Sequence, residues 1–61
     1  MTYYQFRNVY MSLQSALSDV EFVLTVSYEP TIVQTIETLR KSIKGLESEY
    51  PIFTLQLSQP T

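Results

Sequence analysis

Hydrophobic residues recur along the chain in two runs whose spacing alternates between four and three residues. The first run is Phe6, Tyr10, Leu13, Leu17, Val20 and Leu24, and the second is Ile32, Ile36, Leu39, Ile43, Leu46 and Tyr50. This heptad alternation is typical of an apolar seam on one side of a helix. We call these twelve residues the seam. The pattern predicts one helix over residues 3–26 and a second over residues 31–50.

A break between the two helices is predicted at residues 27–30. Pro30 disfavours the helical conformation in the residue before it, and Thr31 with Gln34 has the spacing of a capping box for a new helix. Pro51 lacks an N–H and predicts the end of the second helix. Folding the chain at this break places Phe6 beside Tyr50, so the sequence predicts an antiparallel helical hairpin.

A second interpretation starts from the segment VEFVLTVSYEP. Its residues alternate between apolar and polar, as in a half-buried strand, and they are rich in β-branched side chains. The alternative fold is α+β in an αβαβ order, with strands at residues 20–28 and 52–58. Two strands make a poor sheet without a partner. This fold also gives no reason for the four-three spacing to continue beyond Leu17. We therefore favour an all-α single domain over residues 1–61, with an extended tail at residues 51–61.

The chain is short and has none of the covalent or metal cross-links that stabilise small domains. It has 61 residues with no cysteine and no histidine, which removes disulfides and the usual nitrogen and sulfur metal ligands. Oligomerisation is the remaining route to a sufficient core. Apolar residues outside the seam predict a homodimeric four-helix bundle. The predicted dimer interface comprises Val9, Met11, Ala16, Phe22, Val23 and Val33. The alternative is a monomer whose tail covers this surplus.

Catalysis has little support in the sequence. Without histidine or cysteine, the serines have no visible base, and a single glycine excludes glycine-rich phosphate loops. We predict no cofactor and no metal. The sequence therefore favours a non-enzymatic protein–protein interaction module that acts as a regulator, adaptor or inhibitor, a prediction that rests on exclusion and size.

A ligand site at the open end of the hairpin is the second functional prediction. Tyr3, Tyr4 and Arg7 begin the first helix, while Lys44 and Tyr50 lie near the end of the second. Tyrosine rings with basic side chains can hold a nucleobase and its phosphate. The chain would then bind or sequester an anionic nucleotide. The simpler interpretation is that the tyrosines close the core, with Arg7 in solvent or paired with Glu47 or Glu49.

The tail has two predicted roles. Its apolar residues Phe53, Leu55 and Leu57 can pack on the chain's own bundle or bind a partner by adding a strand to a sheet edge. The net charge of −2 makes nucleic acid an improbable partner. The first residues lack a signal-peptide pattern, and no apolar run reaches the length of a membrane span. We therefore expect a cytoplasmic location without membrane contact.

Overall fold

The computed structural model describes residues 1–59 and contains three helices over that range: α1 (Tyr3–Val26), α2 (Pro30–Glu49) and α3 (Pro51–Leu57). The all-α prediction is confirmed for this part of the chain. The strands predicted by the alternative fold are wrong. Residues from Val20 to Val26 belong to α1, because the seam continues through Val20 and Leu24 and lets them pack on the second helix.

Helix α1 begins at a capping box that we did not predict. The Thr2 hydroxyl accepts a hydrogen bond from the Gln5 N–H at 3.2 Å, and the Gln5 side chain accepts one from the Thr2 N–H at 2.9 Å. The predicted capping box at Thr31 and Gln34 is wrong. Glu29 caps α2 without a side-chain hydrogen bond, because Pro30 already supplies the φ that the first helical position needs.

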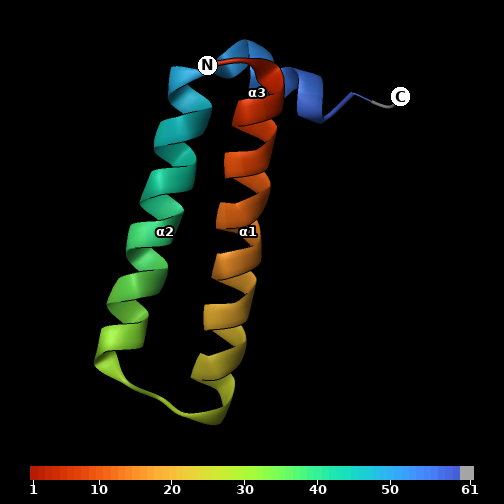
Figure 1. Cartoon of the computed structure of the whole chain (residues 1–61). Coiled ribbons are helices and arrows are strands. Elements are labelled where there is room, and N and C mark those ends of the chain that lie inside the picture. Colours follow the sequence, from red (N-terminus) through yellow and green to blue (C-terminus); the bar gives the residue numbers. More distant parts are fainter. Residues whose placement is uncertain (60–61) are drawn as a thin grey trace.

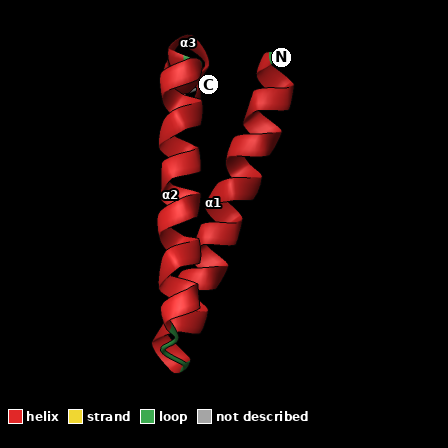
Figure 2. Cartoon of the chain, turned by 90° about the vertical axis from the view of Figure 1, so that its left-hand side faces the viewer, coloured by secondary structure: helices red, strands yellow, loops and turns green. Residues whose placement is uncertain are grey.

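The first two helices lie side by side and run in opposite directions, joined by Ser27–Glu29 (Figure 1). Figure 2 shows that their axes are inclined to each other and lie further apart, in that view, toward the end where the chain begins. Helix α3 lies at this end, against both longer helices. The predicted neighbours Phe6 and Tyr50 have ring centroids 5.8 Å apart.

The extended tail predicted at residues 51–61 is wrong over Pro51–Leu57, which form α3; residues 60–61 lie outside the described part. Pro51 ends α2 as predicted, but it also occupies the first position of a new helix, where a missing N–H costs nothing. Phe53 and Leu57 are four residues apart and both half-buried. The alternation over this short segment therefore concealed a helical face.

The core is small. Only three described residues are buried, namely Phe6 at 0% exposed, Ile36 at 7% and Ile43 at 6%. The other nine seam residues are half-buried. Each helix covers the other on one side only, so the edges of the seam stay accessible to solvent.

Candidate interaction surface

Aromatic residues of α1 and α3, together with Tyr50 between α2 and α3, form one cluster at the end where α3 lies. The Phe6 ring lies 5.6 Å from those of Tyr10 and Phe53, and Tyr50 stacks on Phe53 at 5.8 Å. Tyr3 meets Phe53 edge to face at 5.8 Å. Offset and edge-to-face rings at these separations attract each other beyond their area burial. This cluster explains the complete burial of Phe6.

The residues of the predicted nucleotide site are divided by this packing. Tyr3 and Tyr50 belong to the aromatic cluster, whereas Tyr4 is 74% exposed and Arg7 and Lys44 are exposed. A groove of about 180 Å³ beside Tyr50 is lined by Glu49, Pro51, Ile52 and Phe53, and its charged group is acidic. The structure thus offers tyrosines that close a core, and nucleotide binding stays an untested prediction.

Position relative to the seam divides the remaining residues between two faces. Successive helical residues are about 100° apart around the axis. A residue just before a seam residue therefore points out of the plane of α1 and α2 on one side, and a residue just after it points out on the other. Because the helices are antiparallel, the same rule gives the same side for both.

The face formed by residues that follow the seam carries most of the charge, and we call it the charged face. It includes Arg7, Arg40 and Lys44, three of the four cations of the chain. Two polar contacts join α1 to α2 here. The Tyr10 hydroxyl donates to Glu47 Oε2 at 2.9 Å, and Arg40 pairs with Glu21 at 2.9 Å.

The hydrogen bond to Glu47 and partial desolvation raise the pKa of Tyr10 above its ordinary value of 10.0, against a smaller lowering by Gln14. Helix α3 also reaches this face. Thr54, Leu57 and Ser58 line a groove of about 390 Å³ together with Tyr10, Met11 and Glu47. The charged face is therefore bound together by polar contacts and partly covered by α3.

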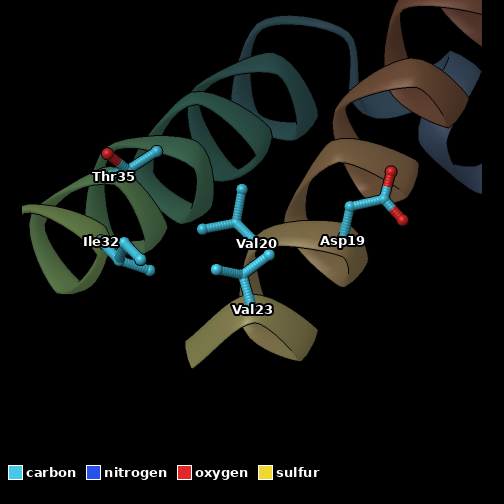
Figure 3. A pocket seen from close by; sticks show the side chains of 5 residues that line it. All are labelled: Asp19, Val20, Val23, Ile32 and Thr35. Carbon is cyan, nitrogen blue, oxygen red and sulfur yellow. The ribbon is translucent and has the colours of Figure 1, made fainter. Parts of the chain in front are cut away.

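The face formed by residues that precede the seam is different, and we call it the open face. On α1 it comprises Gln5, Val9, Ser12, Ala16, Asp19 and Val23, and on α2 Thr31, Thr35, Thr38, Ser42, Gly45 and, at the end of the helix, Glu49. A groove of about 320 Å³ lies between the helices, lined by Asp19, Val20, Val23, Ile32 and Thr35. Figure 3 shows Val20 and Val23 of α1 and Ile32 of α2 around this space. A second groove, of about 310 Å³, is lined by Asn8, Val9, Ser12 and Leu13.

The six residues of the predicted dimer interface lie on three sides of the molecule. Val9, Ala16 and Val23 are on the open face. Met11 and Val33 follow seam residues on the charged face, and Met11 lies where that face meets the outer side of α1. Phe22 is 69% exposed on the outer side of α1. Sequence analysis missed Ser12 and Asp19 as lining residues. Their position just before a seam residue is the signal that identifies them.

The tail residues have separate surroundings. Phe53 joins the aromatic cluster, Leu57 is half-buried beside Tyr10 and Met11, and Leu55 is 59% exposed. Because Pro51–Leu57 is helical, adding a strand to the sheet edge of a partner would require this helix to unfold first, and the partner-binding role of the tail stays an untested prediction. The tail also leaves Val9 and Val23 more than two-fifths exposed, so α3 does not cover the open face.

Other kinds of site find no support in the described residues. Residues 1–59 contain no group of three or more acidic side chains placed to hold a metal ion. None of the helices in that range is sufficiently long and apolar to cross a membrane. Comparisons with protein families, curated proteins and solved structures found no match.

Proposed function

We propose that this chain is a non-enzymatic protein–protein interaction module that works as a homodimer of helical hairpins, in the cytoplasm, as a regulator, adaptor or inhibitor. The proposal rests on the open face, where two apolar grooves leave seam residues accessible from one side of the helical pair. On the opposite face, polar contacts and α3 cover part of the seam.

The exposed surface is larger than a compact chain of this size needs. The chain exposes 4726 Å², whereas the scaling of surface with mass gives roughly 4,100 Å² for 7.1 kDa. The excess of roughly 600 Å² is close to the ~800 Å² that each partner buries in a standard interface. Burial of one face would therefore bring the chain to an ordinary surface area and is on the scale of a stable dimer.

The charges of the two faces support a second copy as the occupant. A two-fold interface brings a face onto itself, so any charge on that face meets its own sign near the axis. The open face has no cation and carries Asp19 and Glu49 away from its centre, whereas the charged face has cations and carboxylates along its length. Self-association through the open face therefore costs the least desolvation of charge.

The outer side of α1 supports a role in binding a further protein. Tyr4, Met11 and Phe22 are each more than half exposed, and spacings of seven and eleven residues keep them on one side of the helix. A dimer formed through the open face leaves this side free. Exposed aromatic and methionine side chains are enriched in the contact surfaces of protein complexes.

Sedimentation equilibrium at micromolar concentration tests the dimer with a matched pair of variants. Ala16 and Ser18 flank Leu17, the first on the open face and the second on the charged face. We expect the unaltered chain and Ser18→Glu to sediment at about 14 kDa, twice the 7.1 kDa of one chain. Ala16→Glu should sediment as a monomer, because a dimer of this variant would bury the two introduced carboxylates, one from each copy, next to each other. Monomers throughout, or equal behaviour of the two variants, would refute the proposal.

A further inference from the structure

The two grooves of the open face are related by a shift of three helical turns. Asn8, Val9 and Ser12 line one groove, and Asp19, Val20 and Val23, each eleven residues later, line the other. Eleven residues are close to three whole turns, so the two sets point to the same side of α1. The open face therefore has two similar hollows, one toward each end of the helix.

Ala16 lies midway between these hollows. Val9 and Val23 stand seven residues before and after it, so the three form a row along α1 that reads the same in both directions. Leu17 points toward α2, which directs Ala16 about a quarter turn away, out of the plane of the two helices. The smallest apolar side chain of the row is thus at its centre, where two helices can approach most closely.

From this symmetry we infer that α1 packs antiparallel on α1 of a second copy, with the two-fold axis passing between the two Ala16 residues and perpendicular to the helices. In this arrangement Val9 of each copy enters the hollow lined by Val20, Val23 and Ile32 of the other. Val23 enters the hollow lined by Val9, Ser12 and Leu13. The inference rests on the proposed homodimer and specifies its orientation.

The contacts are consistent with the chemistry of the face. At an axis separation of roughly 8–10 Å and a Cα radius of about 2.3 Å, facing Ala16 Cα atoms lie about 4–5 Å apart. The two Asp19 carboxylates lie on opposite sides of the axis, and each is level with Ser12 of the second copy, whose hydroxyl can donate to it. Helix α2 meets its counterpart through Thr35, Thr38 and Ser42, which also permit close approach.

The competing dimer has its two-fold axis parallel to the helices and places α1 on α2 of the second copy. In this dimer the two α1 helices do not face each other, so the Cα atoms of the two Ala16 residues are about a helix diameter apart. This separation exceeds the ~7 Å limit on the Cα–Cα distance of a disulfide. Because the chain contains no cysteine, single cysteine substitutions distinguish the two orientations without background.

The experiment compares disulfide formation by Ala16→Cys and Ser15→Cys under a mild oxidant such as diamide. Ser15 is the preceding residue and is exposed on the outer side of α1, so it controls for reactivity. We expect covalent dimer to form at least tenfold faster in Ala16→Cys. In an isotope-labelled mixture of Val9→Cys and Val23→Cys, we expect the mixed disulfide to exceed either symmetric one.

Sedimentation of the reduced Ala16→Cys variant separates the two possible failures. If the reduced protein is dimeric but Ala16→Cys cross-links no faster than Ser15→Cys and the mixed disulfide is not favoured, the orientation is refuted and the homodimer stands. If both the reduced variant and the unaltered chain are monomeric at micromolar concentration, the orientation and the proposed homodimer fail together.

Discussion

The two faces of the helical pair share one seam but surround it differently. On the charged face, the seam is flanked by long polar side chains that contact each other across the helices, and α3 adds a partial cover. On the open face, most flanking residues are short, the charges of Asp19 and Glu49 lie away from the centre, and two hollows reach the seam.

This difference supports the proposed homodimer, because one face suits solvent and the other suits contact with a second copy. Long charged side chains cover apolar surface with their stems and keep their charges in water. Short side chains cannot do so, but they allow another helix to approach closely. Long charged side chains such as Arg7, Arg40 and Lys44 follow seam residues, whereas most of the residues that precede the seam are short. One face therefore suits solvent and the other suits contact with a partner.

The largest effect is expected at the residue on which both faces depend. Phe6 is completely buried among Tyr10, Tyr50 and Phe53, so Phe6→Ala removes the centre of the aromatic cluster. The free energy of unfolding should fall by about 3–5 kcal/mol, as for other buried phenylalanines. Circular dichroism during urea titration measures it. A loss below about 1 kcal/mol, well under the usual cost of the cavity that a buried phenylalanine leaves, would mean that the cluster does not hold the three helices together.

The next effect separates the open face from the outer side of α1. Val23→Asp places a carboxylate in the groove that we propose a second copy fills, whereas Phe22→Asp places one at the adjacent, more exposed position. We expect Val23→Asp to raise the dimer dissociation constant at least hundredfold, about 3 kcal/mol, because each dimer buries two unpaired charges. Phe22→Asp should leave it within a few-fold. Sedimentation measures both constants, and equal weakening would remove the distinction between the two sides.

A smaller effect is expected on the charged face. Tyr10→Phe removes the hydroxyl that donates to Glu47 and should lower the free energy of unfolding by about 0.5–1.5 kcal/mol. The dimer constant should not change. Urea titrations of both proteins measure the first, and dilution measures the second. A weakened dimer would show that Tyr10 belongs to the interface.

The same contact gives a pH dependence of defined sign. Because the pKa of Tyr10 is raised in the folded chain, the protonated hydroxyl is the stabilised form. Its contribution is complete below pH 10 and is lost as pH rises through the raised pKa. The stability difference between the unaltered chain and Tyr10→Phe should therefore shrink in this alkaline range, and a difference that grows there would contradict the assignment.

The smallest effect is expected at the exposed ion pair. The side chains of Arg40 and Glu21 are 61% and 45% exposed, so Arg40→Gln should lower the free energy of unfolding by less than about 1 kcal/mol. Added salt should reduce this difference further by screening. Urea titrations in low and high salt measure it. A large loss of unfolding free energy that does not depend on salt would show that the ion pair is buried in a contact with another chain.

Much of the fold follows from local pattern in the sequence. The four-three spacing of the seam predicted both long helices within a residue or so at each end, because burial of twelve apolar positions outweighs the strand propensity of Val20–Val26. The helix at Pro51–Leu57 was missed because five or six alternating residues fit either period. Its helical form depends on the packing of Phe53 against Phe6 and Tyr50, residues remote in sequence.

The candidate surface was only partly predictable. Val9, Ala16 and Val23 were identified by their seven-residue spacing, but Met11, Phe22 and Val33 were grouped with them on hydrophobicity alone. Assigning residues to faces requires the direction in which the seam points, and this is known only when α2 is placed beside α1. The burial of Tyr3 and Tyr50 likewise depends on α3, whose position the tail's sequence does not reveal.

The central claim is that burial of the open face by a second copy completes the core. The thermal unfolding midpoint measured from about 1 to 100 μM tests it most directly, because stability linked to association depends on protein concentration. For a dimer of this length, an unfolding entropy of about 2.1 cal/mol/K per residue predicts a rise of roughly 5 °C for each tenfold increase in concentration. A midpoint that stays constant over the whole range would contradict the claim.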